Sequence, residues 1–537
     1  MIKRKKGKIA KSLQHMRDKY YIDRGYMMEL CKFSQKVNKL EKNFINFLQP
    51  YIRITFRTFY ILHFTFYILI LLSCSPTTDN DKGNLSGTVN LEGELDHSGV
   101  QVGLYDLCEL DADIMEANDK WSQIGFEINQ RTEFDHRENI PLKIAETDKN
   151  GNFIFSNIGT GDYNLAIVKP GWGIKYICDL EVSGKDYIIP EIIELSLLIE
   201  LEGDISGTHI FESGKSYFTD AVNFVPESEI ILESGTNILI AGNNLSIYGS
   251  ITVEGDPDSY FLITNASGMD EISPDISLPE RTGQVFFRST VAVDLTLSYG
   301  KISYLETGLL NETNLGIVIE LHHLRINHCG SGIKLSNLAS CDITNCVISD
   351  CNRDDNGGIN IEETDTGIVS YNIITHSTIG IRMRHRTDFD VNNNYIYGNE
   401  IGFKGLHFTG RIEHNEFTRN ENADISICGT YGAVDEPMEI EYNNFSSSRG
   451  ITSFYNSSYG SNCRVSSLKY NNFSNSISFI RISSGYPEID ARYCYFGGLN
   501  NEVEIDARIY DDDEDEEYPL VDFSGFVIVK IGAAGIE

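Results

Sequence analysis

The residues best suited to chemistry lie in the run GIRMRHR at positions 380–386. In an extended strand, successive side chains point to opposite faces, so Arg382 and Arg384 are expected on one face and Ile381 and Met383 on the other. Two cationic side chains on one strand face can attract an anionic ligand, because the rest of the chain is strongly acidic. A charged strand face can equally serve only to prevent aggregation.

Neighbouring segments place similar residues at the equivalent outward positions. These are Lys334, Asn360 with Glu362, and Lys404, while His385 and Arg386 stand at the margin. If the register holds, Lys334, Arg382 and Lys404 share one face, about one repeat apart, and Glu362 can orient an arginine. The ligand-binding candidates are therefore Lys334, Glu362, Arg382, Arg384 and Lys404. Catalytic work, if any, would fall to Arg382, Arg384 or His385 as proton-transfer groups.

The sequence supports a metal site less well than an anion-binding face. Seven histidines crowd the same region, namely His322, His323, His328, His376, His385, His407 and His414. Their differing phases argue against three of them converging on one ion, so we predict turn or surface histidines and no metal site. The acidic run DDDEDEE at 511–517 leaves Ca²⁺ open, but it lacks the glycine and ligand spacing of a defined loop. We expect a solvated turn and no cofactor.

Common catalytic motifs are missing from the sequence. It has no lipase-type G-x-S-x-G, no HExxH, no P-loop and no spaced Cys/His zinc pattern. Eleven cysteines are present, of which Cys31 and Cys74 precede the body of the mature protein. The remaining nine cannot all pair internally. Cys329 and Cys351 follow equivalent positions of neighbouring repeats, which predicts a possible disulfide in an oxidising compartment.

Charge divides the chain into two parts. Residues 1–57 carry 15 Lys/Arg against 4 Asp/Glu, whereas the remainder carries 29 against 74. A body this acidic disfavours nucleic-acid binding. Between the two parts lies an uncharged, strongly apolar run, 58–78, typical of an export segment. Its end, Leu-Leu-Ser-Cys at 71–74, resembles the lipobox of bacterial lipoproteins, which implies a lipid on Cys74; an uncleaved signal anchor remains the alternative.

The segment 84–197 reads as short strands separated by turns, at 86–91, 101–105, 153–155 and 163–168. The turns DKNG at 148–151 and GTGD at 159–162 contain residues that tolerate positive φ. An all-β sandwich follows. The run 146–165 resembles carboxypeptidase regulatory-like (transthyretin-like) domains. That resemblance implies a non-catalytic accessory module.

The C-terminal part contains a repeat of about 21–28 residues. Apolar anchors recur, usually with asparagine two places earlier: Asn345/Val347, Asn372/Ile374, Asn394/Ile396, Asn415/Phe417, Asn443/Phe445 and Asn471/Phe473, with Ile326 and Phe496 at the ends. A second pattern of a glycine and then an apolar residue follows in phase, as in Gly358-Ile359 and Gly380-Ile381. Coils of this length must stack to bury their apolar side chains, and asparagines at one position would bond from coil to coil.

These repeats resemble right-handed parallel β-helix proteins of the pectate-lyase-like superfamily over residues 198–526. A leucine-rich repeat is excluded because its Leu-x-x-Leu-x-Leu frame is missing. In β-helix polysaccharide lyases, a cationic face holds the uronate carboxylate while Arg, Lys or His removes the adjacent proton. The resemblance therefore implies an anionic polysaccharide as one possible ligand.

The domain plan follows. Residues 1–73 form a basic extension and signal segment, 74–83 a tether, 84–197 the sandwich, 198–526 the β-helix and 527–537 a C-terminal tail. We expect a cell-envelope lipoprotein, at the outer membrane, whose β-helix binds extracellular glycan or another surface partner without catalysis. A polysaccharide lyase acting on an anionic polymer is the first alternative, and a structural or adhesive stalk is the second.

Overall fold

The structure is a computed structural model that describes residues 82–537 except 185, 277, 289–294, 313–315, 354–355, 386–387, 430–437, 447–451, 459–464, 475–478, 482–488 and 511–519. The predictions for residues 1–81, Cys74 and Arg386, and for the acidic run 511–517, therefore lie outside the described residues.

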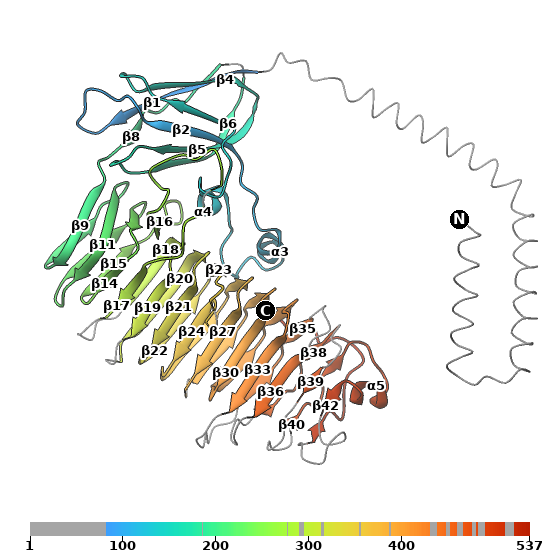
Figure 1. Cartoon of the computed structure of the whole chain (residues 1–537). Coiled ribbons are helices and arrows are strands. Elements are labelled where there is room, and N and C mark those ends of the chain that lie inside the picture. Colours follow the sequence, from blue (N-terminus) through green and yellow to red (C-terminus); the bar gives the residue numbers. More distant parts are fainter. Residues whose placement is uncertain are drawn as a thin grey trace, which may run out of the picture. The chain divides into compact units, whose positions relative to one another are not determined.

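Two packed sheets form the N-terminal module (Figure 1). One contains β4 (Asn152–Ile158), β1 (Gly83–Leu91), β7 (Asp186–Ile188) and β8 (Ile193–Leu195); the other contains β3 (Lys143–Glu146), β2 (Gln101–Asp106), β5 (Gly161–Val168) and β6 (Lys175–Val182). Alternate residues of β1, including Leu85 and Val89, are fully buried against Val102 and Leu165 of the second sheet. Period-2 alternation thus places one face of each sheet in a shared core. The expected sandwich and its four strands are confirmed.

An insertion between β2 and β3, residues 107–142, contains two helices that the sequence reasoning did not anticipate. These are α3 (Ala112–Lys120) and α4 (Gln130–Glu133). The carboxylate of Asp111 accepts from the first free amides of α3. Asn129 caps α4 and forms a reciprocal capping box with Thr132. Both caps were readable as helix starts, because aspartate and asparagine are preferred there.

The C-terminal module is a parallel β-helix with three sheets, which we name A, B and C (Figure 1). Sheet A contains β10 (Thr208–Phe211), β12 (Glu229–Glu233), β15 (Ser250–Glu254), β22 (Ser340–Thr344), β25 (Thr366–Ser370), β28 (Asp388–Asn392), β31 (Thr409–Glu413), β34 (Met438–Glu441), β37 (Val465–Ser467), β40 (Ile489–Asp490) and β43 (Val521–Asp522).

Sheet B contains β13 (Asn237–Ile240), β16 (Phe261–Asn265), β23 (Val347–Ser349), β26 (Ile373–Thr375), β29 (Tyr395–Tyr397), β32 (Glu416–Thr418), β35 (Asn444–Ser446), β38 (Asn472–Phe473) and β41 (Tyr495–Phe496). The long strands β18 (Leu295–Ser303) and β20 (Val318–Asn327) pass from sheet A into sheet B.

Sheet C contains β14 (Asn244–Ile247), β17 (Gln284–Phe287), β19 (Thr307–Glu312), β21 (Ser331–Ser336), β24 (Ile359–Glu362), β27 (Ile379–Arg384), β30 (Ile401–Leu406), β33 (Ala423–Gly429), β36 (Thr452–Ser458), β39 (Ile480–Arg481) and β42 (Ile509–Tyr510). At the first coils, β9 (Ile199–Ile205) pairs with β11 (Ser216–Phe224), and a short helix, α5 (Glu502–Asp506), precedes β42.

One apolar residue per coil forms a continuous spine inside the β-helix. The paired positions are Ile326, Ile348, Ile374, Ile396, Phe417, Phe445, Phe473 and Phe496. The phenylalanine rings stack with centroids 5.0–5.4 Å apart. The predicted spine is confirmed with one correction: Val347 is not part of it, because Ile348 occupies that register position. A shift of one residue moves a strand side chain to the opposite face.

The asparagine ladder is also confirmed, at Asn372, Asn394, Asn415, Asn443 and Asn471. Each side-chain oxygen accepts from a backbone N–H of the preceding coil at 2.8–3.0 Å. Each amide nitrogen donates to a carbonyl of the preceding coil at 2.7–2.8 Å. Asn345 does not belong to the ladder, since Cys346 occupies the equivalent place. The left-handed residue is the one before each ladder asparagine, for example Tyr371 and Tyr442.

Candidate functional site

The predicted cationic strip has the expected register on sheet C. Lys334 pairs with Asn360, Asn360 with Arg382, and Arg382 with Lys404. Lys334 and Arg382 are therefore two coils apart, with Asn360 between them. Ile381 and Met383 are fully buried on the inner face, as alternation requires.

The strip is not an open row of cations. Lys334 Nζ lies 3.5 Å from the Glu312 carboxylate, and Arg384 donates to Glu362 at 2.8 Å. Arg382 is only 7% exposed. Because acidic partners from neighbouring strands already compensate Lys334 and Arg384, they offer little net attraction for an anion.

His385 lies at the left-handed turn beyond the strand rather than on the strand face. Its ring stacks on His407 at 6.0 Å. The same holds for His328, His376, His407 and His414, which also have positive φ directly after a strand, whereas His323 has positive φ within the long strand β20. Over the described part of the chain, no group of three His, Cys, Asp or Glu side chains could hold a metal ion.

Cys329 and Cys351 do lie in register on adjacent coils, as expected, but both are free thiols in the structure. The predicted disulfide is thus absent from it. Each sulfur instead contacts the carbonyl two residues before it, Asn327 O and Ser349 O, at 3.4 Å. Burial raises the pKa of the Cys329 thiol to about 11, so both side chains behave as small apolar groups.

The outward face of sheet B is covered by the insertion 107–142. Val347 and Ile373 point outward from consecutive coils and are fully buried against α3, together with Ile114 and Ala117. Gly125 N–H donates to Tyr371 O at 2.6 Å, close enough that a Cβ at Gly125 would clash with Ile373. This explains why sheet B strands carry apolar residues at consecutive positions: both of their faces are buried.

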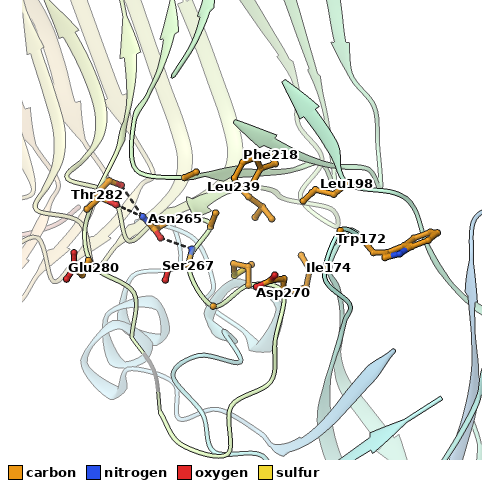
Figure 2. Close-up of a pocket in the computed structure, with 15 residues that line it drawn as sticks. Trp172, Ile174, Leu198, Phe218, Leu239, Asn265, Ser267, Asp270, Glu280 and Thr282 are labelled. Carbon is orange, nitrogen blue, oxygen red and sulfur yellow. Dashed lines mark hydrogen bonds between the residues drawn. The ribbon is translucent and has the colours of Figure 1, made fainter. Parts of the chain in front are cut away.

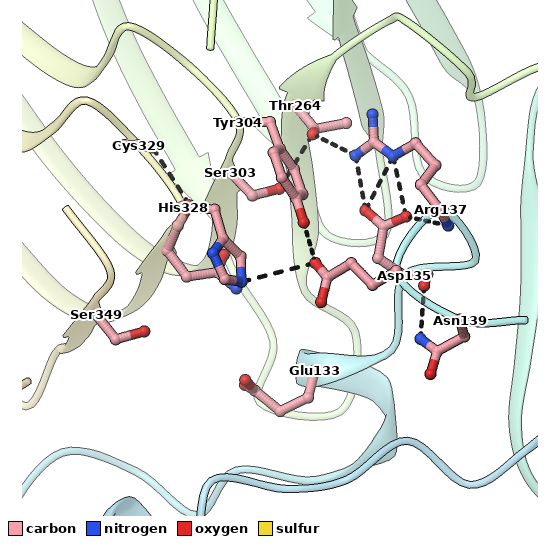
Figure 3. Close-up of polar contacts among 12 residues, drawn as sticks. Glu133, Asp135, Arg137, Asn139, Thr264, Ser303, Tyr304, His328, Cys329 and Ser349 are labelled. Atoms are coloured by element: carbon pink, nitrogen blue, oxygen red, sulfur yellow. Dashed lines mark hydrogen bonds and ion pairs between the residues drawn. The ribbon is translucent and has the colours of Figure 1, made fainter. Parts of the chain in front are cut away.

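Charged groups fix the insertion to the β-helix (Figure 3). Arg325 on β20 donates twice to Glu133, at 2.8 Å each. Burial opposes the ionisation of Glu133, but the Arg325 guanidinium outweighs it and holds the carboxyl pKa below its usual value. Tyr304 donates to Glu138, and its ring stacks on His328 at 5.2 Å. Buried charges that are fully paired in this way anchor one segment on another.

Further along sheet B, the C-terminal tail packs on the outward face in place of the insertion. Ile531 N–H donates to Asn472 Oδ1 at 2.9 Å, and Gly535 N–H donates to Tyr442 O at 2.7 Å. The last residue, Glu537, donates from its N–H to Asn393 and accepts from Gln123 of the insertion. Insertion and tail therefore meet and cover most of the sheet B face between Val347 and Asn472. A hollow of about 140 Å³ remains between α3 and the sheet B residues Tyr395, Tyr397 and Glu416.

Sheet A is different because its outward face carries an open groove of about 710 Å³. The groove crosses β22, β25, β28, β31 and β34, and its lining residues are Ser340, Asp342, Thr366, Gly367, Ile368, Asp388, Asp390, Gly410, Arg411 and Glu439. The central positions pair coil to coil as Asp342, Ile368, Asp390, Arg411 and Glu439. The sequence reasoning missed this site, although the alternation of acidic and apolar residues in DFDVN and MEIE would have shown it.

The groove gathers negative charge. Its only lining cation among the described residues, Arg411, is shared between Glu413 at 3.6 Å and Glu439 at 3.4 Å. Burial raises the pKa of Asp342, and the neighbouring Glu320 adds to the effect. Burial likewise raises the pKa of Glu413, which Arg411 opposes. The lining carboxylates of Asp342, Asp388, Asp390 and Glu439 outnumber this one arginine, so the groove attracts cations and repels anions.

A family model described as a right handed beta helix region matches residues 309–433, which include most of the groove. The C-terminal module is therefore a right-handed parallel β-helix, preceded by the small β-sandwich. No curated protein and no solved structure matches the chain. Within the described residues, no helix is both long and apolar enough to cross a membrane.

Proposed function

We propose that this protein is a cell-envelope lipoprotein whose β-helix binds extracellular glycan without catalysis, and that the groove on sheet A is the binding face. The observation that carries the proposal is the groove itself, a hollow about 710 Å³ in volume that runs across five consecutive strands. The chain covers most of sheet B with its own segments, whereas it leaves this acidic face open.

The groove has the chemistry to hold an extended polyhydroxylated chain. Carboxylates accept from sugar hydroxyls, and Ser340 and Thr366 add hydroxyl groups on neighbouring strands. Strand side chains repeat every 4.7–4.9 Å or so along the axis, so a linear polymer can meet equivalent groups on successive coils. The negative charge favours neutral or amino-bearing sugars over uronates.

The lyase alternative depends on the cationic strip of sheet C. A lyase needs a cationic or imidazole group free to remove a proton beside a carboxylate. Glu362 already engages Arg384, and His385 lies at a turn beyond the strand. These contacts support the binding role over the lyase role.

The test uses the exported chain, purified in detergent, on a panel of neutral, amino-bearing and uronate oligosaccharides. We expect binding of neutral or amino sugars, with no unsaturated product and no new reducing ends. Replacing Asp388 and Asp390 by Asn should weaken binding at least about fivefold, since two charge-assisted hydrogen bonds become neutral. Exchanging Glu362→Gln on sheet C is the matched control and should change nothing.

Three outcomes would reject the proposal. Uronate cleavage that disappears in Arg384→Ala would establish the lyase. Release of reducing ends that depends on Asp390 would establish a hydrolase. A complete lack of glycan binding by the folded chain would leave the structural stalk.

A further inference from the structure

A second hollow lies between the sandwich and the first coils of the β-helix, far along the chain from the groove. Its volume is about 430 Å³, within the range of about 300–1,000 Å³ usual for small-molecule pockets. One wall comes from the β5–β6 loop of the sandwich, with Trp172 and Ile174, and from Leu198 in the segment that links the two modules. The opposite side comes from the loop between β16 and β17, through residues 266–270, Glu280 and Thr282.

The lining combines an apolar floor with an acidic rim. Ile174, Leu239 and Met269 are at most 6% exposed, and Phe218 adds an aromatic wall. Figure 2 shows Phe218 and Leu239 on one side of the hollow and Asp270 on the other, while the indole of Trp172 points away from its middle. Asp270 and Glu280 both line the pocket. Among the lining residues, all of which the structure describes, there is no lysine or arginine.

The loop that carries this rim is held in place by buried polar contacts from the insertion. Arg137, 3% exposed, donates to Asn265 O at 2.7 Å and to Ser267 O at 3.1 Å. His136 lies 3.0 Å from Gly268 O and 3.2 Å from Glu271 O through Nε2.

A second set of contacts holds the two ends of the same loop together. Asn265 donates to Thr282 at 2.7 Å and accepts from Ser267 N–H at 2.8 Å. An irregular loop fixed by fully satisfied buried groups gives a preformed pocket rather than a loose crevice.

We infer that this junction pocket binds a small amphipathic cation, a molecule with one apolar ring or short chain and a single protonated amine. The apolar part would rest on Phe218, Leu239 and Met269, and the ammonium would lie at the rim near Asp270 and Glu280. The site is separate from the glycan groove, so the inference stands or falls independently of the proposed function.

Three probes with similar carbon skeletons test the charge preference: phenethylamine, 2-phenylethanol and phenylacetate. The chain contains two tryptophans, Trp121 and Trp172. Trp121→Phe keeps a ring against Tyr395 and leaves Trp172, beside the pocket, as the only reporter of fluorescence. We expect phenethylamine to bind three- to tenfold more tightly than 2-phenylethanol, and phenylacetate to bind weakest, because exposed carboxylates contribute modest attraction.

Variants locate the effect. Ala241→Phe, at the exposed rim, should block all three probes. The double variant Asp270→Asn/Glu280→Gln should bind phenethylamine and 2-phenylethanol about equally tightly. Its affinity for 2-phenylethanol should be unchanged. Asp275→Asn, on the same loop but outside the pocket lining, is the matched control and should change nothing.

The inference is overturned if Trp172 responds to none of the probes, if phenylacetate binds as tightly as phenethylamine, or if Ala241→Phe leaves phenethylamine binding intact. Circular dichroism and thermal unfolding of each variant establish that the chain still folds, so that lost binding reports on the pocket.

Discussion

Sheets A and B are built from the same coils, yet the outward face of sheet B is largely buried and that of sheet A is exposed. On adjoining strands of one coil, Ile373 on sheet B is fully buried under the insertion, whereas Ile368 on sheet A is 38% exposed. Around Ile368 the outward positions are carboxylates and hydroxyls. Two adjacent apolar residues in a short strand therefore mark a face that another segment covers, and alternation with acidic residues marks a face left open.

The strongest test of this contrast places a charge on each face. Ile373→Asp should lower the free energy of unfolding by about 4 kcal/mol, because an unpaired carboxylate would be buried between α3 and sheet B. Ile368→Asp, on the open face, should cost less than about 1 kcal/mol. Chemical denaturation followed by circular dichroism measures both.

A local readout sharpens the same experiment. Opening the insertion is the cheapest way to hydrate the new carboxylate, so limited proteolysis of Ile373→Asp should cut within 107–142 first. Equal destabilisation by the two substitutions would contradict a covered sheet B and an open sheet A.

Ion pairs offer a second comparison. Arg325→Met leaves Glu133 charged and buried, which should cost about 3 kcal/mol of unfolding free energy. Arg384→Met breaks the pair with Glu362 on sheet C, whose side chains are 33% and 24% exposed, and should cost about 1 kcal/mol or less. Adding Glu133→Gln to Arg325→Met should recover much of the loss. If it recovers nothing, the Glu133 charge is not what the arginine compensates.

The ladder predicts a smaller effect inside the β-helix. Asn394→Ala removes a side chain that bonds to Asn372 N–H and Val369 O of the preceding coil and to Asn415 of the following one, leaving buried polar groups unsatisfied at a cost of about 2 kcal/mol. Asn392→Ala, two residues earlier on the outward face of β28, is the control and should stay within about 0.5 kcal/mol. Thermal unfolding compares the two variants.

Acid should gradually lower the free energy of unfolding through His136, which packs the insertion against the first coils of the β-helix. Burial lowers the pKa of His136, which lies between Asp135, Arg137 and Tyr176. The unfolded chain therefore takes up this proton first as the pH falls below about 6.5, and stability falls with it by at most about 1.4 kcal/mol per pH unit.

The control for this pH dependence is His136→Gln, which cannot titrate. Other histidines with lowered pKa values act in the same direction, so the difference between the chain and His136→Gln is the quantity to follow. Identical pH profiles would contradict a neutral, buried His136.

Much of this architecture was predictable from the sequence. The recurrence of asparagine and an apolar residue once per coil located the spine and the ladder, because stacked coils repeat one environment. The error at Val347 arose because Val347 and Ile348 are both apolar and Asn345 stands one place before the ladder position, which Cys346 occupies.

The candidate site was less predictable, for physical reasons. Like charges on one strand suggest an anion-binding face, but their acidic partners lie on adjacent coils. Glu312 lies beside Lys334, and Glu362 lies beside Arg384. Sequence spacing cannot show such compensation across long separations. The insertion was overlooked because its helices are short and obtain their stability from packing, α3 on sheet B and α4 on β6 of the sandwich.

The most direct test of the open acidic face is carboxyl footprinting of the folded chain by mass spectrometry, with and without the glycan that it binds best. The account predicts that the glycan protects Asp388 and Asp390 from labelling while Glu362 on sheet C and Asp270 at the junction pocket label as before. Protection at Glu362 with none at Asp388 or Asp390 would contradict it.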